Sequence, residues 1–412
     1  MFTYVLFLRA YPAHVGFGFA LTFFSSLGQT FLISLYVPHI LADLGISNSA
    51  FGGMYAIATI GSALLLIQFG GRIDRRPLPG YVLKTIVILG GASVLLGLTR
   101  HTLMLPFALL GLRFGGQGLM SHISQTTLGR FFQEDRGKAL SLASLGFPAG
   151  EMIFPLVIAL LIPLVGWRVS LGINAAVLLG VLAPALCFFP LNDFERAKVQ
   201  TASDAAARTG ISRRAILTDP AFRRIAPSAI FLGFSNTAVF FYQLVLAENR
   251  GWPVAWYSAV FSGYAAARFA FGLLGGLLVD RFTARRLYAL HFLPMVLGLL
   301  VLASSPDRWV ALVFLCCAGI SLGLHSPIKA AVMAEVHGTA NLGAVRSVYT
   351  SFLVGGTALG PMVFGLLLDR GVSFGAILTG TALILALTVL PSIALAFPAW
   401  ERGSLCSART GR

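Results

Sequence analysis

Long apolar segments, separated by short polar ones, alternate along the whole chain. Each has about 20 residues or more, the length that an α-helix needs to cross a bilayer. They lie at residues 15–40, 50–69, 81–99, 103–129, 138–165, 169–190, 225–247, 254–279, 286–304, 309–333, 343–368 and 373–398. The pattern therefore predicts an all-α membrane protein with twelve transmembrane helices.

The longest polar segment, residues 191–224, divides these helices into two groups of six. Its Asp219-Pro220 pair is typical of a helix start, because proline fits the first turn of a helix. Part of the segment is expected to lie as a helix on the membrane surface. The predicted parts are an N-terminal six-helix bundle at 1–190, a cytoplasmic linker at 191–224, a C-terminal six-helix bundle at 225–398 and a cytoplasmic tail at 399–412.

The composition excludes a soluble protein with one large core. Of the 412 residues, 57% are hydrophobic and 11% are charged, whereas a soluble domain has about 25% charged residues. A net charge of +15 would indicate nucleic-acid binding in a soluble protein. Here the basic residues lie mainly in short loops between apolar segments, so we expect the lipid bilayer, and no nucleic acid, as a partner.

The placement of lysine and arginine predicts the orientation. Cytoplasmic loops of membrane proteins carry an excess of these residues. With both termini in the cytoplasm, most basic loop residues lie inside, and the outside loops hold Arg100, Arg168, Arg250, Arg308 and Arg370. We therefore expect a multi-pass protein of a bacterial inner (plasma) membrane with both termini cytoplasmic.

A glycine-containing turn follows both the second and the eighth predicted helix. Its two copies contain Gly70, Asp74 and Arg75, and Gly276, Asp280 and Arg281. The two aspartates are separated by half the length of the chain, which indicates duplicated halves. Aspartate at such a turn can pair with arginines and with a helix N-terminus, so both Asp-Arg pairs are predicted to gate the inner face. The alternative is that they only anchor the topology.

Three charged residues fall in the middle of predicted helices. At a rise of about 1.5 Å per residue, Arg113, Glu151 and Arg268 lie near the centre of a bilayer core about 30 Å thick. The same measure places Lys329 near the cytoplasmic face. A charge at mid-depth is costly and is a functional hypothesis by default.

Arg268 is the predicted substrate anchor. Its planar guanidinium can bind a carboxylate through two hydrogen bonds, although a structural ion pair or a snorkelling side chain would also explain it. Other polar residues within predicted helices are candidate substrate contacts, or bridges between helices. These are Gln29, Asn236, Gln243, Tyr264 and Tyr349.

Arg113 and Glu151, on adjacent predicted helices, form a second candidate site. Burial raises the pKa of a carboxyl and a nearby cation lowers it, so Glu151 is a candidate for proton coupling. The alternative is a permanent ion pair that holds the two helices together. His122 and His325 are weaker candidates for a proton relay, because a lone histidine in a helix more often serves packing.

These features resemble the major facilitator superfamily. The resemblance rests on two groups of six helices, a basic linker and the Gly-three-residues-Asp turn. Arg113 followed by Gly116-Gln117-Gly118 is similar to the family motif associated with proton coupling. The stretches from Arg130 to Gly150 and from Pro327 to Pro361 resemble the monocarboxylate and oxalate/formate branch. The resemblance implies two pseudo-symmetric six-helix bundles, the major facilitator fold, with a substrate site at mid-membrane between the halves.

The pattern Gly-x-Ser-x-Gly occurs at residues 319–323 and 371–375, but neither copy follows a predicted strand, as a nucleophile elbow would. The sequence contains no Walker-type phosphate loop or zinc-binding His-Glu-x-x-His motif, so an enzyme is not expected. We expect a secondary active transporter that moves a small organic anion, a monocarboxylate, together with protons by alternating access. No cofactor or metal and a monomeric state are expected. One alternative is proton-driven export of a drug or metabolite, because residues 146–150 partly resemble an antiporter motif. A non-transporting membrane sensor on the same scaffold is the other.

Overall fold

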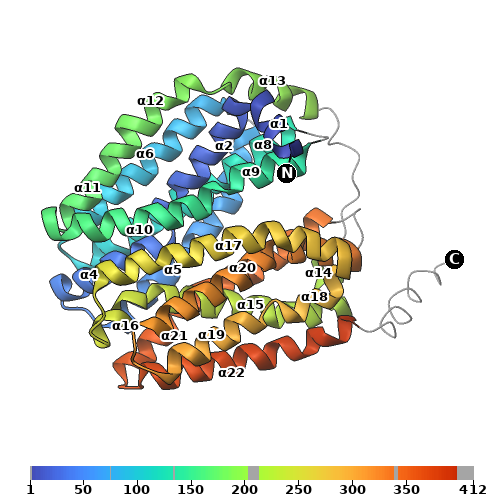
Figure 1. Cartoon of the computed structure of the whole chain (residues 1–412). Coiled ribbons are helices and arrows are strands. Elements are labelled where there is room, and N and C mark those ends of the chain that lie inside the picture. The colour runs from blue at the N-terminus through green and yellow to red at the C-terminus, as the bar shows by residue number, and fades with distance from the viewer. Residues whose placement is uncertain (1, 75, 133–134, 203–212, 338–341, 397–412) are drawn as a thin grey trace. The chain divides into compact units, whose positions relative to one another are not determined.

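The computed structural model describes residues 2–74, 76–132, 135–202, 213–337 and 342–396 (Figure 1). Within these ranges, ten helices are long and apolar enough to cross a membrane. Two bent helix pairs bring the number to twelve when each pair counts as one span. The predicted all-α fold with twelve spans is confirmed.

The chain forms two compact units. Unit 1 holds residues 1–208 and 240–259, and unit 2 holds residues 209–239 and 260–412. The domain boundaries predicted at residues 190, 224 and 398 stay a prediction.

Unit 1 is a bundle of helices in which α6 packs against α7 and α11, and α2 packs against α8, α9 and α10. Its helices are α1 (Phe2–Ala10), α2 (Pro12–Ser25), α3 (Thr30–Ile33), α4 (Val37–Leu44), α5 (Asn48–Phe69), α6 (Leu78–Gly97), α7 (Leu105–Leu112), α8 (Ser121–Phe131), α9 (Arg136–Ser144), α10 (Gly146–Val165), α11 (Trp167–Val177), α12 (Ala183–Ala185), α13 (Leu191–Ala202) and α16 (Gln243–Asn249). Two π-helical stretches, η5 (Arg113–Met120) and η6 (Leu178–Leu182), continue α7 into α8 and α11 into α12. Short 3₁₀ turns are η1 (Ser26–Gly28), η2 (Ser34–Tyr36), η3 (Gly70–Asp74), η4 (Thr102–Met104) and η7 (Leu186–Phe188).

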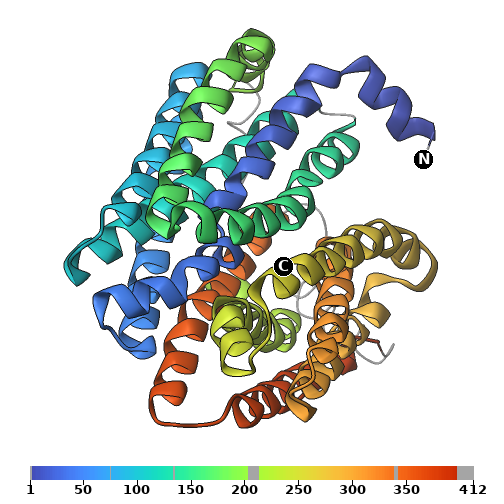
Figure 2. The ribbon, with the colours of Figure 1, turned by 60° about the vertical axis from the view of Figure 1, so that its left-hand side comes forward.

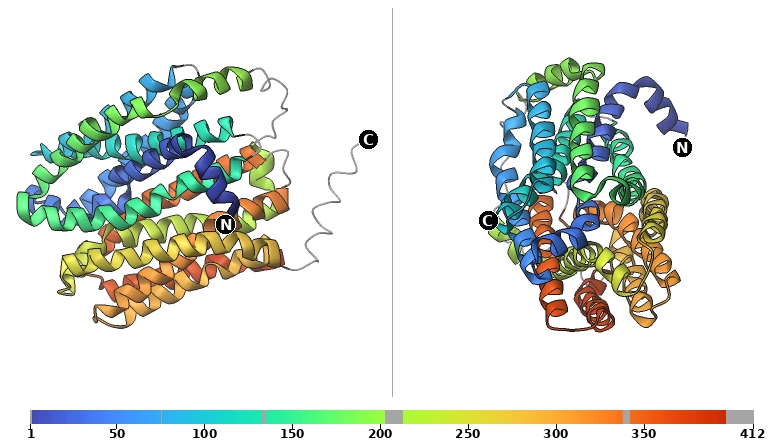
Figure 3. Two further views of the ribbon diagram at one scale, coloured as in Figure 1. Left: turned by 45° about the horizontal axis from the view of Figure 1, so that its top comes forward. Right: turned by 90° about the vertical axis from the view of Figure 1, so that its left-hand side faces the viewer.

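Unit 2 contains most of α15 and α17, and its α19 packs against α20 and α22. Its helices are α14 (Arg213–Thr218), α15 (Pro220–Phe241), α17 (Val254–Phe282), α18 (Ala284–Leu290), α19 (Leu293–Ser304), α20 (Trp309–His337), α21 (Leu342–Asp369) and α22 (Phe374–Ile393), followed by the short turn η9 (Ala394–Ala396). The long helices of this unit, yellow to red in Figure 3, run side by side.

The first and seventh spans are broken, although the sequence predicted continuous helices at 15–40 and 225–247. Residues Pro12–Gly28 and Thr30–Leu44 meet at 42°, and Pro220–Phe241 and Gln243–Asn249 meet at 49°. The first break lies at Gln29, whose backbone is extended with φ −87° and ψ 154°. Apolar length therefore located both spans correctly, but hydrophobicity carries no signal for a change of helix direction.

A short helix, α1, precedes the first span and was not predicted. Figure 2 shows it as a separate helix, at an angle to α2. Phe7 is buried and its ring lies 4.9 Å from that of Phe132, so this side chain fixes α1 to the end of α8. Leu6 and Leu8 on α1 are exposed.

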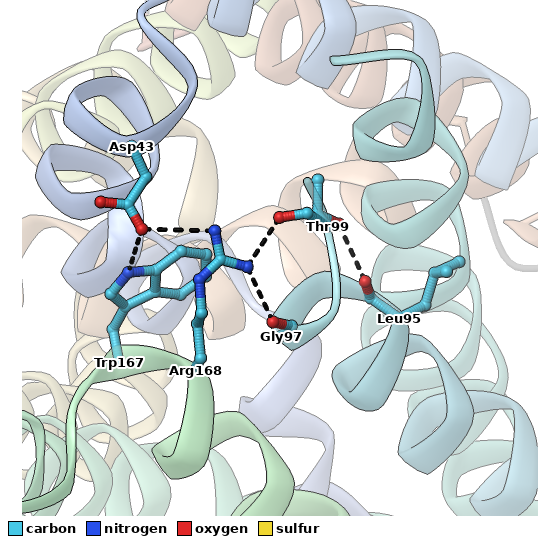
Figure 4. A network of polar contacts seen from close by, with 6 residues as sticks. All are labelled: Asp43, Leu95, Gly97, Thr99, Trp167 and Arg168. Carbon is cyan, nitrogen blue, oxygen red and sulfur yellow. Dashed lines mark hydrogen bonds and ion pairs between the residues drawn. The ribbon is translucent and has the colours of Figure 1, made fainter. Parts of the chain in front are cut away.

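Arg168 holds one end of unit 1 together (Figure 4). It lies at the start of α11 and donates hydrogen bonds to the carbonyl oxygens of Gly97 and Thr99, at 2.9 Å and 2.7 Å. It also pairs with Asp43 of α4 at 3.3 Å, and Asp43 accepts a hydrogen bond from the Trp167 indole at 3.0 Å. Gly97 is the last residue of α6 and Thr99 follows two residues later, so this cation satisfies carbonyl groups that the helix end leaves unpaired.

The last turn of α20 binds the starts of two other helices in unit 2. The Glu335 carboxylate accepts hydrogen bonds from the backbone N–H groups of Ala284 and Arg285, at 2.8 Å and 3.1 Å, and so caps α18. His337 lies 3.0 Å from the carboxylate of Asp219. Asp219 also accepts a hydrogen bond from Ala221 N–H at 2.7 Å, which confirms the helix start predicted at Asp219-Pro220.

The pKa of Asp219, in the segment before α15, is lowered. Burial alone would raise the pKa of this carboxyl, but the hydrogen bond with His337 and the bond from Ala221 N–H outweigh that effect. The ionised form of Asp219 is therefore the one that the surrounding structure stabilises.

Candidate substrate and proton sites

Three of the predicted residues gather around the break in the first span of unit 1. Gln29 is the extended residue at the break, and the next residue, Thr30, accepts a hydrogen bond from the Arg113 guanidinium at 3.2 Å. Gln243 donates to the Ser34 hydroxyl at 2.8 Å and to the Phe31 carbonyl at 3.2 Å. The break therefore brings together polar groups from three spans.

Arg113 is almost fully buried, with 2% of its surface exposed. Its guanidinium lies over the Tyr55 ring at 5.1 Å, and the Tyr55 hydroxyl lies 2.6 Å from Thr30 Oγ1. Arg113 begins the π-helical stretch η5, a feature that the sequence analysis did not predict and that occurs frequently at functional sites. The glycines at residues 115, 116 and 118 give the only composition signal for this irregularity.

A glycine contact fixes the distance between the first and fourth spans. A methyl group on Gly116 would lie 2.7 Å from the Cα of Gly28 and 2.9 Å from the carbonyl oxygen of Ser25. Only residues without a side chain allow two backbones to approach so closely. This contact holds η5 against η1, directly before Gln29.

Glu151 is buried in α10, which packs against η1 and α3. The structure records no ion pair between Glu151 and Arg113 among the residues that it describes; Arg113 contacts Thr30 and Tyr55 instead. A permanent ion pair between these helices, the structural alternative considered for the two residues, is therefore absent from the described part of unit 1.

Arg268 and Tyr264 lie one turn apart on α17 in unit 2. The Arg268 guanidinium donates a hydrogen bond to the Tyr264 hydroxyl at 3.2 Å. Two glycines of α20 pack on the backbone at this point, since a methyl group on Gly319 would lie 3.1 Å from Arg268 N and one on Gly323 would lie 2.6 Å from Arg268 O. The position of Arg268 is therefore set by a close contact between α17 and α20.

Tyr349 and Asn236 lie on other helices than the Arg268–Tyr264 pair. Tyr349, on α21, is buried; its hydroxyl lies 3.4 Å from that of Tyr288, and the Lys329 ammonium lies 5.9 Å from its ring. Asn236 is on α15, and its buried Oδ1 has no hydrogen-bond partner. A buried polar atom of this kind needs an explanation, such as a ligand or a water molecule.

The predicted gating residues are described only in part. Arg75 and the side chains of Asp74 and Asp280 lie outside the described residues. Arg281 is exposed at the end of α17, with its guanidinium 5.3 Å from the Phe282 ring. The gating role stays a prediction.

The sequence analysis missed a pair of histidines. His291 Nε2 and His325 Nδ1 lie 3.0 Å apart inside unit 2. His325 was considered alone, but its partner is 34 positions earlier in the chain, and nothing in the sequence pattern connects the two.

The comparison with family models decides the family. The model of the Major Facilitator Superfamily matches residues 18–254 and 225–404. The chain belongs to the major facilitator superfamily. As a member of this superfamily it is a multi-pass integral membrane protein of the secondary transporter class.

Solved structures agree with the superfamily fold. A bacterial homologue of the human lysosomal transporter Spinster, in an inward-facing and occupied conformation, matches with a TM-score of 0.68 and 16% identity, over 96% of this chain and 98% of that one. The nucleoside transporter NupG, as a mutant, matches with a TM-score of 0.73 and 14% identity, over 95% of this chain and 100% of that one. Identities this low show a common fold and carry no information on the substrate.

Plastidic glucose transporter 4 of Arabidopsis thaliana is similar in sequence to part of this chain. It is 30% identical over 165 residues, which cover 38% of this superfamily chain and 28% of the plant protein. The matched region thus spans less than a third of that relative.

Proposed function

We propose that this superfamily member carries a small organic anion, a monocarboxylate, across a bacterial inner membrane together with protons. The proposal places both termini in the cytoplasm and the substrate at Arg268. The sequence motifs favour the monocarboxylate and oxalate/formate branch of the superfamily. Gln29, Asn236, Gln243, Tyr264 and Tyr349 are the further candidate substrate contacts.

One observation carries the proposal: the charges inside the spans of unit 2 are positive. Arg268 lies in the middle of α17 and Lys329 lies in α20. The acidic side chains that the structure describes in unit 2 lie at helix ends or in connections, at Asp219, Asp307, Glu335 and Asp369. Positive charge in a poorly hydrated interior favours an anionic ligand, because Coulomb interactions strengthen as the dielectric constant falls.

The position of Arg268 beside Tyr264 suits a carboxylate. The guanidinium fork can bind both carboxylate oxygens, and the tyrosine hydroxyl can donate one more hydrogen bond. In unit 1, Glu151 is a proposed proton acceptor. The positive charge of Arg113, at the break of the first span, influences whether Glu151 is ionised. These two roles rest on burial and on position within the spans.

The direct test measures uptake of labelled short carboxylates into proteoliposomes under an imposed pH gradient. Arg268→Lys keeps the charge but loses the fork, so we expect at least about a tenfold loss of uptake, and a larger loss for Arg268→Ala. Arg100→Lys, in an exposed loop, is the matched control and should transport like the parent. If both Arg268 variants transport like the parent, Arg268 is not the anchor.

Proton-driven export of a drug or metabolite is the second candidate. The stretch at residues 146–150 favours it, because this stretch partly resembles an antiporter motif. In the structure, Gly150 of this stretch packs against the Ser26 side chain and the Phe23 carbonyl. Export predicts drug resistance on overexpression and no competition by short carboxylates. The proteoliposome experiment separates the two functions, since only the first predicts uptake of carboxylates.

A further inference from the structure

His291 and His325 form a buried pair in unit 2. His291 lies between α18 and α19, His325 lies on α20, and their exposed fractions are 1% and 7%. The Nε2 atom of His291 and the Nδ1 atom of His325 are 3.0 Å apart, which is a hydrogen-bond distance. Ser321, one turn before His325, donates a hydrogen bond to the His291 carbonyl at 2.7 Å and holds the two segments in register.

The outer nitrogens of the pair, His291 Nδ1 and His325 Nε2, are both buried and make no hydrogen bond with the side chains that the structure describes. Backbone carbonyls of Leu287 and Tyr288 interact with the His291 ring. A neutral imidazole carries one N–H donor and one acceptor nitrogen. The backbone carbonyls favour an N–H at His291 Nδ1, so His325 Nδ1 donates the shared hydrogen bond and His325 Nε2 is a bare acceptor. Buried polar atoms are rarely left in this state, except at sites with a chemical role or a bound water or ion.

The bare nitrogen can accept a proton without any movement of the pair. The added proton creates one imidazolium, which keeps its hydrogen bond to the neutral partner ring. Hydrogen bonds to a charged group are stronger than those between neutral groups. The geometry therefore provides for two states of the pair, neutral and singly protonated.

The groups around the pair are cationic or neutral in the described part of unit 2. Arg268 of α17 and Lys329 of α20 both interact electrostatically with His325. Tyr288 of α18 packs edge-on against His291, with ring centres 5.3 Å apart, and Tyr349 of α21 stacks on His325 at 6.4 Å. On α15, Ser228 is hydrogen-bonded to Tyr288 at 3.1 Å, while α19 and α22 contain no titratable residue.

We propose that His291 and His325 are a proton-binding pair whose occupancy is coupled to anion binding at Arg268. This inference rests on the proposed function and assigns the coupled proton to a pair in unit 2, with Glu151 as the alternative carrier from which the test below distinguishes it. A proton on the pair is repelled by Arg268 and Lys329. A carboxylate bound at Arg268 neutralises part of that positive charge, so anion and proton each favour binding of the other. One proton enters from water on one side with the anion and returns to water on the other side.

The transport arm of the test separates exchange from coupled accumulation. The His291→Gln and His325→Gln variants keep a hydrogen-bonding side chain but cannot hold the proton. Both should retain exchange of labelled for unlabelled anion. In the parent, one coupled proton allows a gradient of one pH unit to drive about tenfold accumulation of the anion. Both variants should lose this accumulation. His101→Gln, exposed before η4, is the matched control and should accumulate anion like the parent.

A spectroscopic arm does not depend on transport. Ring ¹⁵N spectra of histidine-labelled protein, assigned with the two glutamine variants, report the protonation of each nitrogen. With a saturating short carboxylate present, the signals of both rings should shift together between about pH 8 and pH 5 as one proton enters the pair, and without the anion the same shift should need a lower pH. Retained accumulation in both glutamine variants would overturn the proposal, as would rings that stay neutral or titrate independently. If the parent exchanges no carboxylate, the proposed function fails, and the spectra alone then decide whether the pair binds a proton.

Discussion

The contact between Gly116 and Gly28 gives the sharpest prediction from the structure. In Gly116→Ala, the added methyl carbon would lie 2.7 Å from Gly28 Cα, 2.8 Å from Gly28 N and 2.9 Å from Ser25 O. All three are backbone atoms, which cannot turn aside as the end of a flexible side chain can. The fourth span must therefore move away from the first. Overpacking of this kind costs about 1–3 kcal/mol, and we expect the upper part of that range.

The matched control is Gly91→Ala in α6. No atom lies within 4 Å of the methyl group at that position, so the only effect is the change from glycine to alanine inside a helix. That change stabilises a helix by about 0.5–1 kcal/mol. The two alanine variants should therefore shift the stability of the protein in opposite directions.

The assay is unfolding of the purified protein in detergent, followed by loss of helical signal with heat. Gly116→Ala should unfold several degrees below the parent and Gly91→Ala at or above it. Anion exchange should also fall in Gly116→Ala, because the contact lies directly before Gln29 and positions Thr30 against Arg113. If Gly116→Ala unfolds and exchanges like the parent, the two backbones are not in contact and the reasoning is wrong.

Two further predictions concern the ends of the helices. Arg168→Met should lower the free energy of unfolding by about 1–2 kcal/mol, because the hydrogen bonds to the carbonyls of Gly97 and Thr99 are lost. Arg168→Lys should recover only part of this loss. Full recovery by lysine in denaturant titrations would show that charge alone matters. Asp219 has a lowered pKa, so its stabilising effect is complete above the ordinary carboxyl pKa of about 4 and is lost as the pH falls through the lower value in the folded protein. The parent should therefore lose stability more steeply on acidification below about pH 5 than Asp219→Asn, and equal slopes in unfolding experiments across that range would contradict this account.

The architecture was readable from the sequence because apolar length and loop charge report directly on the bilayer. Asp219-Pro220 predicted the start of α15 for a local reason, since proline and a capping carboxylate act within one turn. The breaks at Gln29 and Tyr242 were not predictable in the same way. A helix can bend wherever tertiary contacts replace its lost hydrogen bonds, and Gln243 finds such contacts at Ser34 and Phe31 only after folding.

The candidate sites show the same division. Arg113, Glu151 and Arg268 stood out because a charge in an apolar segment is visible without any structure. The pairing of His291 with His325 was invisible, because it depends on how α18, α19 and α20 pack. The ion pair considered as the alternative for Arg113 and Glu151 rested on their depth in the bilayer and on the neighbouring positions of their helices. Depth does not specify the face of a helix, and Arg113 contacts Thr30 and Tyr55 instead.

The end of α20 has a consequence for motion within unit 2. Glu335 binds the start of α18 and His337 binds Asp219 at the start of α15, so one helix end is the common attachment point for two others. If α20 tilts or shifts along its axis, the starts of α15 and α18 must follow it, or all of these contacts break together. Local opening at the two helix starts is therefore a single cooperative event. The three helices are therefore expected to move together at this end. Thr283, between α17 and α18, has φ +68° and so departs from helical geometry at the junction of these two helices.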